Sequence, residues 1–495
     1  MTLHRFFVIF WCIFSSLHSN GIFALPEVGR WIERIDKNST LVFHRSMLRS
    51  SEIQLKLYCS KPATLALSWI LLQSPCFEMF FGVDTDKLAN NMAEASFTSA
   101  DVTFVRESQS LKCDANNPVN VEGSAPILPK ENQIYIPSFS NEYMAVSPGL
   151  LAKVWDSGAH LLILNVKCPV DVEMRNPSGG FLSALEAPFL PVSFTESYCL
   201  NYTLLHPFHM PSILFVQFNA VMVCLYAIAC VVWLVFLVRY WRDVMRIQLL
   251  IGLLLFLGLC EHSAFLAVFE SLRKTGQFAV SAFYFGEILT CVKRTLVRIL
   301  MLAACLGYGI TKPRLGTIWF RRCLAIGFVF FVLFLLESVG RVSQPRMVTT
   351  TFRLITVAVL SCLDTAVMWW MFTYLARTLR ETRMRRNLVK HTLYRRFSYV
   401  LVIAFVVSLS FLVTSFELFK HYPCIKNWRF LWIDESFWQF VFFILLVVIM
   451  ALWRPTGSNR EYAYSLLDNP IDTAEDEEEV LLDRLGEGGG EHLSI

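Results

Sequence analysis

The sequence predicts a membrane protein in which a lumenal all-β sandwich precedes a bundle of seven transmembrane helices. Apolar residues make up 55% of the 495 residues and the mean hydropathy is +0.48, too apolar for a water-soluble globule of this size. The long apolar runs all lie after residue 210, whereas the preceding segment alternates apolar and polar residues. A membrane half joined to a soluble half follows from this contrast.

Residues 1–24 have the layout of a signal peptide. Arg5 precedes an apolar run over residues 6–14, and a polar stretch follows. This run is too short to cross a hydrocarbon core that needs roughly 20 residues. We therefore expect cleavage after Gly21 or Ala24, with the next domain in the lumen of the secretory pathway.

Residues 25–210 are expected to form the β-sandwich. Ile53, Leu55 and Leu57 alternate with polar residues, and prolines interrupt the segment at short intervals from Pro118 to Pro169. Runs of period two that are broken by proline are typical of short antiparallel strands.

Seven apolar runs within residues 211–453 are each long enough for one helix across about 30 Å of hydrocarbon. They lie at about 212–238, 248–270, 278–303, 320–340, 350–376, 397–418 and 433–453. Seven crossings from a lumenal domain place the C-terminus in the cytosol. Lysine and arginine support this topology, because fifteen lie in the loops expected to be cytosolic and seven in the facing loops. Residues 454–495 are predicted to be a disordered acidic cytosolic tail.

The lumenal side is expected to carry disulfides and glycans. An even set of six cysteines in an oxidising compartment indicates three disulfides, although 15 pairings are possible. We predict the pairs Cys59–Cys113, Cys76–Cys424 and Cys168–Cys199, of which the second would join the β domain to the bundle. Asn38 and Asn201 are acceptors for N-glycosylation.

The sequence contains no constellation typical of an enzyme. It has no phosphate-binding glycine loop, no histidine or cysteine pair at metal-ligand spacing and no nucleophile motif. We therefore expect neither catalysis nor a metal or other cofactor, apart from a bound phospholipid, and no nucleic-acid partner. A typical G-protein-coupled receptor is not favoured, because the third helix ends in Leu306–Gly309 and not in an Asp-Arg-Tyr sequence. An atypical seven-helix receptor stays an alternative.

Charged residues inside the predicted helices are the candidate functional residues. An ionised group that faces lipid costs at least about 2.5–3.5 kcal/mol, so these side chains are expected to face one another or water. Glu287, Arg294 and Arg298 are 7 and 4 residues apart and share one face of the third helix. One interpretation is a set of interhelical ion pairs; the other, which we favour, is a polar cavity for a lipid headgroup, an ion or a protein-borne acyl chain. The candidate residues are Glu261, His262, Glu287, Lys293, Arg294, Arg298, Glu337, Asp364, Asp434 and Glu435.

The tail carries two candidate sorting signals. One is a Tyr-x-x-apolar sequence from Tyr464 to Leu467, and the other is an acidic dileucine sequence that ends in Leu481 and Leu482. Clathrin-type adaptors bind such signals in an extended form, so both need an unstructured carrier. The pair indicates cycling between compartments.

Several stretches resemble the transmembrane-protein-87 family, a branch of the Golgi-dynamics-domain seven-helix proteins. They are Lys293–Leu296, Leu306–Thr317, Trp432–Trp438, Leu452–Pro455 and Tyr462–Ser465. The resemblance covers residues 245–480 strongly and the lumenal half by layout and cysteine placement. This chain departs from the family pattern at Phe269–Ser271, at the lumenal end of the second helix.

The resemblance implies a Golgi-resident protein whose bundle is organised like that of the Wnt-carrying protein Wntless, with a large lumen-facing cavity that can hold a lipid. The residues of the matching motifs that would line it are Glu261, Glu287, Lys293, Arg294, Arg298 and Asp434. The family is associated with retrograde traffic from endosomes to the trans-Golgi network, and also with cation currents and mechanically evoked currents.

The preferred functional hypothesis is therefore a trafficking protein, or a lipid- or cargo-binding chaperone, that cycles between the Golgi, endosomes and the plasma membrane. Its expected partners are membrane lipids, clathrin-type adaptors and a cargo or channel partner that the sequence does not identify. The alternative is a mechanically or voltage-sensitive cation channel, or an accessory subunit of one.

Overall fold

The structure, a computed structural model, describes residues 26–34, 39–59, 62–74, 103–113, 118–123, 149–166, 168–177, 180–184, 218–308, 317–342, 351–384, 388–415 and 431–455. The signal peptide, both glycosylation acceptors (Asn38 and Asn201) and the tail signals (Tyr464, Leu467, Leu481 and Leu482) lie outside the described residues. Those features stay predictions.

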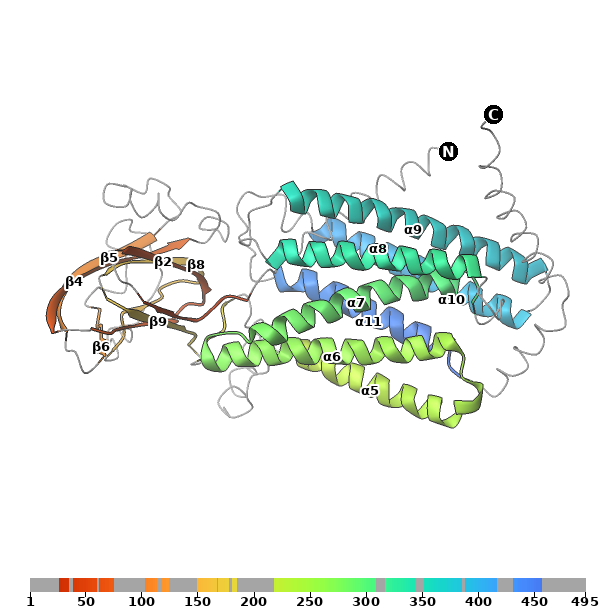
Figure 1. Ribbon diagram of the computed structural model, residues 1–495, viewed down its shortest axis with the longest axis horizontal. Helices are drawn as coiled ribbons and strands as arrows, with labels where there is room; N and C mark the ends of the chain where they lie inside the picture. Colours follow the sequence, from red (N-terminus) through yellow and green to blue (C-terminus); the bar gives the residue numbers. More distant parts are fainter. Residues whose placement is uncertain are drawn as a thin grey trace, which may run out of the picture.

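Two antiparallel sheets form the N-terminal domain (Figure 1). One has the strand order β1-β9-β3-β6, with β7 also paired to β3, and the other has the order β2-β8-β4-β5. The strands are β1 (Arg30–Glu33), β2 (Ser39–Met47), β3 (Glu52–Leu57), β4 (Ala63–Ser74), β5 (Thr103–Cys113), β6 (Val119–Asn120), β7 (Ala152–Lys153), β8 (Gly158–Val166) and β9 (Val170–Arg175). The predicted all-β sandwich is confirmed.

Alternate residues of the strands fill the space between the two sheets. Ile53, Leu55 and Leu57 of β3 are fully buried, and the polar residues between them are only partly buried. They belong to one cluster with Trp69 of β4 and Leu162 of β8. A period of two places such side chains on one face of a strand, and each fully buried one contributes roughly 1.5–3 kcal/mol.

The predicted disulfide between Cys59 and Cys113 is confirmed. Its cysteines are 54 residues apart in the sequence, and closing a loop of that length stabilises the fold by about 4 kcal/mol in the chain-entropy model. The other two predicted pairs include cysteines outside the described residues, so they stay predictions. Of their four cysteines only Cys168 is described, as a buried, free cysteine.

Seven helices follow in the described part of the chain (Figure 1). They are α5 (Phe218–Arg239), α6 (Arg246–Thr275), α7 (Val280–Cys305), α8 (Thr317–Val342), α9 (Thr351–Met384), α10 (Leu388–Ser415) and α11 (Leu431–Leu452). Each overlaps one of the seven predicted apolar runs. Two helices differ clearly from the predictions: α9 continues past residue 376, and α10 begins before residue 397, because charged segments beyond the apolar runs are also helical.

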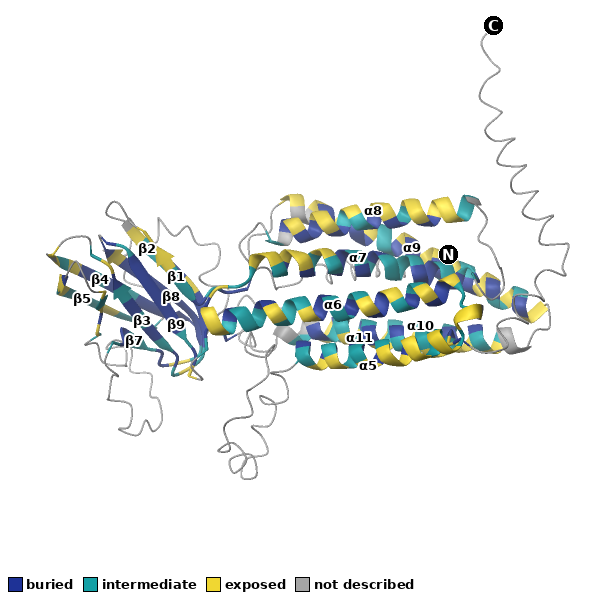
Figure 2. Cartoon of the chain, turned by 60° about the horizontal axis from the view of Figure 1, so that its bottom comes forward, coloured by how far each residue is buried: buried dark blue, intermediate teal, exposed yellow. Residues whose placement is uncertain are grey.

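Five of these helices are long and apolar enough to span a membrane by length and composition: α5, α6, α8, α9 and α10. Residues 436–452 of α11 form a shorter apolar helix. Helix α7 has 26 residues, which is also long enough to span a membrane, but it carries charged residues near its middle. Exposed apolar side chains such as Val235 of α5 and Phe328 of α8 lie on the outside, where Figure 2 shows exposed faces.

The end of the bundle far from the β domain is joined by a buried glutamine. The side-chain amide of Gln248 on α6 donates to the carbonyl of Trp453, at the end of α11, over 3.1 Å. The Trp233 indole of α5 donates to the carbonyl of Gln248, also over 3.1 Å. The ring of Trp453 packs against Phe397 of α10 with 5.1 Å between centroids. These contacts hold four helices together at that end.

Candidate functional site

Helix α7 organises the candidate functional site. It packs against α6, α8 and α9. Its residue Lys293 contacts α6, while Glu287 contacts α8 and Arg298 contacts α9. With 3.6 residues per turn, Lys293 is turned by about 100° from its neighbour Arg294, which shares the face of Glu287 and Arg298. The helix therefore presents two polar faces to different partners.

The first polar face contains a buried ion pair. The Lys293 ammonium pairs with the Glu261 carboxylate of α6, and the two side chains are 5% and 1% exposed. The Thr290 hydroxyl, one turn earlier on α7, donates to the same carboxylate over 2.8 Å. The Lys293 ammonium also lies 4.9 Å from the centroid of the Phe442 ring of α11. This contact fits the ion-pair interpretation more closely than an open cavity at Lys293.

Polar residues of α5 and α6 continue this buried group. A ring nitrogen of His262, Nδ1, lies 3.1 Å from the side-chain oxygen of Asn219. The His262 ring packs against Tyr226 with 5.4 Å between centroids. All three side chains are buried. The sequence interpretation had identified His262 but missed Asn219 and Thr290, whose only signal is a small polar residue within an apolar run.

The second polar face contains a more accessible ion pair. The Arg298 guanidinium donates to both carboxylate oxygens of Asp364 on α9, over 2.6 and 2.8 Å. The side chains are 25% and 17% exposed. The guanidinium also lies over the rings of Phe330 and Phe334 of α8, 5.2 and 4.6 Å from their centroids. Bidentate pairing with a carboxylate and stacking on aromatic rings are both typical of arginine, and together they fix the orientation of the guanidinium.

Of the remaining candidate residues, Glu287 and Arg294 lie on this second face of α7. Ser338 of α8 donates to the Glu287 carboxylate over 2.7 Å, and the neighbouring Glu337 is buried. Arg294 is half-buried, and its carbonyl accepts a bond from Arg298 over 3.2 Å. No ion pair of the Arg294 side chain occurs in the part of the chain that the structure describes. The side chains of Asp434 and Glu435 lie outside the described residues.

Acidic and basic side chains share the second face of α7, at Glu287, Arg294 and Arg298. Glu287 and Arg294 are seven residues apart on one helix, roughly 10 Å along its axis. The two groups are therefore too far apart along the helix for a direct ion pair. Among the described residues, no group of three histidine, cysteine or acidic side chains gathers as in a metal site.

A second notable site is the junction between the β domain and α6. Gly276 follows the last helical residue and has a φ of +74°, the left-handed conformation that ends many helices. Its carbonyl accepts bonds from the backbone N–H groups of Gly29 and Arg30, over 2.8 and 3.2 Å. The N–H of Phe181 donates to the carbonyl of Arg273 over 3.1 Å. Two segments of the sandwich therefore hold the end of α6.

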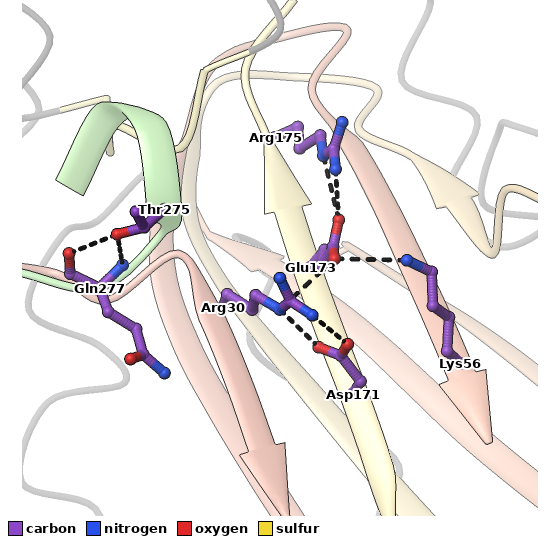
Figure 3. Close-up of polar contacts among 7 residues, drawn as sticks. All are labelled: Arg30, Lys56, Asp171, Glu173, Arg175, Thr275 and Gln277. Atoms are coloured by element: carbon purple, nitrogen blue, oxygen red, sulfur yellow. Dashed lines mark hydrogen bonds and ion pairs between the residues drawn. The ribbon is translucent and has the colours of Figure 1, made fainter. Parts of the chain in front are cut away.

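Side chains support the same junction. Leu182 of the β domain and Leu272 of α6 belong to one buried cluster. The Thr275 hydroxyl donates to the carbonyl of Gln277 over 2.9 Å and accepts a bond from its N–H, which orders the turn beside the sheet (Figure 3). The sequence interpretation did not predict this junction, since its hydrogen bonds are between backbone atoms of distant segments.

A charged network on the outer face of the sheet continues from the junction (Figure 3). The buried carboxylates are Asp171 and Glu173 of β9; Arg30 binds Asp171 over 2.7 and 3.0 Å. Arg175 and Lys56 bind Glu173 over 2.6 and 3.4 Å. Burial alone raises the pKa of the Glu173 carboxyl, but these cations outweigh that effect, so its pKa lies below the usual value. Arg30 thus joins this network to the end of α6.

Both halves of the chain are similar to known proteins. Residues 214–460 match the family model described as "GOST, seven transmembrane domain", and residues 25–167 match "TMEM87A/B, GOLD domain". The chain is 30% identical to transmembrane protein 87A of Xenopus tropicalis, over 94% of this chain and 84% of that protein. It is 28% identical to transmembrane protein 87B of Homo sapiens, over 94% and 80%. It is 29% identical to membrane protein PTM1 of Saccharomyces cerevisiae, over 37% and 36%.

Proposed function

The chain belongs to the family of transmembrane proteins 87A and 87B, and from this premise we propose that it is a Golgi membrane protein that binds a phospholipid in its seven-helix bundle. In this proposal it acts in retrograde traffic from endosomes to the trans-Golgi network, as a trafficking factor or cargo chaperone. The residues facing α8 and α9 support the lipid part, and the two tail signals support the traffic part.

The observation that carries the lipid proposal is the partly exposed polar face of α7. Its Arg298–Asp364 pair retains 25% and 17% side-chain exposure, whereas the Lys293–Glu261 pair is buried. The phosphate of a phospholipid would accept hydrogen bonds from arginine on this face, and an ammonium headgroup would lie near Glu287. The aromatic rings beside Arg298 supply an apolar wall for the acyl chains.

We expect Glu287→Gln to lower the amount of phospholipid that co-purifies with the protein by roughly tenfold, the loss of one charge-assisted hydrogen bond. Mass spectrometry of lipid extracted from equal amounts of folded protein measures this change. Glu270→Gln is the matched control, because Glu270 pairs with Arg273 and Lys274 at the end of α6 and not at the proposed site. Unchanged lipid in Glu287→Gln with a clearly lower melting temperature would favour a purely structural role.

Recording currents from purified protein in liposomes separates this proposal from the alternative of a cation channel. A trafficking protein or chaperone is expected to give no current above that of empty liposomes. Reproducible cation currents that Glu287→Gln or Asp364→Asn alters would replace the lipid proposal with conduction through this polar face.

The tail signals lead to a separate expectation. The triple variant Tyr464→Ala, Leu481→Ala and Leu482→Ala should move the protein several-fold toward the cell surface, because adaptors would no longer hold the tyrosine ring or the leucine pair. Surface biotinylation and Golgi staining measure the shift. If both stay at the wild-type level, the tail has no part in sorting.

A further inference from the structure

The turn between α9 and α10 carries an unusual concentration of exposed positive charge. Helix α9 ends at Met384 and α10 begins at Leu388, so the two form a hairpin at the end of the bundle opposite the β domain (Figure 1). Their exposed arginines are Arg377, Arg380, Arg383, Arg395 and Arg396. None is more than nine residues from the turn, which is about 14 Å along a helix. We call these five residues the arginine end.

Little negative charge balances the arginine end. Arg377 donates to Glu381 over 2.9 Å, a pair whose side chains are 72% and 35% exposed. Arg395 donates to the hydroxyl of Tyr399 over 3.2 Å, which leaves its charge uncompensated. In the part of the chain that the structure describes, the other three arginines form no ion pair. An unbalanced cluster of this kind attracts a polyanionic segment.

A neighbouring helix adds to the same charge. Trp319 of α8 packs against Tyr374 of α9 with 5.3 Å between ring centroids. This contact brings the start of α8, with its exposed residues Arg321 and Arg322, to the side of α9 just before the arginine end. The Arg322 guanidinium lies over the Trp319 ring at 5.0 Å and stays exposed.

The C-terminal tail leaves the bundle beside the arginine end. The last described residue is Pro455, two residues after Trp453. The Trp453 ring packs against Phe397, whose chain neighbour is Arg396. Beyond this point the sequence has seven carboxylates within residues 472–483: Asp472, Glu475, Asp476, Glu477, Glu478, Glu479 and Asp483. The intervening 16 residues (456–471) span up to about 55 Å when extended, ample to reach the arginine end.

We propose that the acidic segment 472–483 docks on the arginine end of the same chain. The charges are complementary, and the short tether makes the contact intramolecular, so it forms at a high effective concentration. The segment contains Leu481 and Leu482, so the docked tail would withhold the dileucine signal from an adaptor. Only this consequence rests on the proposed sorting role; the docking itself does not.

The test uses the full-length protein with a photo-crosslinking amino acid in place of Val480. Mass spectrometry of the digested product is expected to find cross-links to α9 and α10 within residues 377–396. The triple variant Arg380→Gln, Arg383→Gln and Arg396→Gln should lower this yield roughly fivefold or more, as expected for the loss of three exposed ion pairs. Raising the salt concentration from 0.05 M to 0.5 M should lower it in the wild type as well.

The matched control is Arg239→Gln, Arg242→Gln and Arg246→Gln, at the turn between α5 and α6. These arginines are exposed, and Gln248 joins their turn to Trp453, so the control removes equal charge from another turn that contacts the start of the tail. We expect the cross-link yield to stay within about twofold of wild type. Equal losses in the two triple variants, or cross-links spread over both turns, would overturn the assignment to the arginine end.

Two further arms identify competing explanations. Cross-links that form in nanodiscs of neutral lipid but are lost when about 20% of the lipid is phosphatidylserine would show that the arginines bind the membrane surface instead. Surface biotinylation distinguishes the docking from the sorting role. Cross-links that persist while the Tyr464, Leu481 and Leu482 triple variant keeps its wild-type location would leave the docking standing and remove the sorting role.

Discussion

Replacing Lys293 with methionine is expected to lower the free energy of unfolding of the bundle by about 3–5 kcal/mol. The substitution leaves the Glu261 carboxylate, which is 1% exposed, without its cation. The hydrogen bond from Thr290 stays but does not neutralise the charge. Thermal unfolding of the detergent-solubilised protein, followed by fluorescence, measures the loss as a lower melting temperature.

Two control variants show whether the loss comes from the buried charge. The double variant Glu261→Gln with Lys293→Met removes both charges and is expected to recover most of the stability, because a neutral pair leaves no isolated ion. Arg377→Met breaks the exposed pair with Glu381, so it should cost less than about 1 kcal/mol. A double variant as unstable as Lys293→Met would show that packing, and not charge, dominates here.

The second large effect is expected at the junction, where Gly276→Ala should lower stability by about 3 kcal/mol. A left-handed residue with a side chain costs about 1–2 kcal/mol by itself. In addition, the new Cβ would lie 2.7 Å from the Cβ of Arg30 and 3.1 Å from its backbone nitrogen. The sandwich would have to move away from α6, and the bonds from Gly29 and Arg30 would lengthen.

Gly149→Ala is the control for backbone conformation alone. Gly149 has a φ of +86°, but its added Cβ meets nothing closer than 3.8 Å, so only the cost of about 1–2 kcal/mol applies. Hydrogen exchange at Gly29 and Arg30 should rise in Gly276→Ala and not in Gly149→Ala. Equal protection in both variants would mean that the junction tolerates the clash and does not depend on these bonds.

The sequence was sufficient for the architecture because its signals are local. Alternation at Ile53, Leu55 and Leu57 depends only on the period of a strand, and the apolar runs depend only on the thickness of a bilayer. The same locality explains why α9 and α10 extend beyond the predicted apolar runs. Hydropathy marks where a helix is apolar, whereas hydrogen bonding continues the helix into the charged segments that form the arginine end.

The sequence identified the charged residues inside the helices but not their contacts, and their role in a lipid or ion site stays a prediction. Helical spacing correctly placed Glu287 and Arg298 on one face of α7, and the cost of a charge in lipid correctly marked Asp364 and Glu261 as residues that need partners. The sequence did not assign the partners themselves. Arg298 and Asp364 are 66 residues apart, so their meeting depends on how α7 and α9 pack.

The sequence by itself therefore determined the two-part fold, the family and the set of intramembrane charges, since each follows from composition, spacing and local motifs. Only the tertiary structure decided which charges are buried in pairs and which stay accessible. It also decided that the sandwich is hydrogen-bonded to the end of α6 at Gly276. The physical reason is that ion pairs and backbone hydrogen bonds between distant segments are set by three-dimensional proximity, which local sequence patterns do not encode.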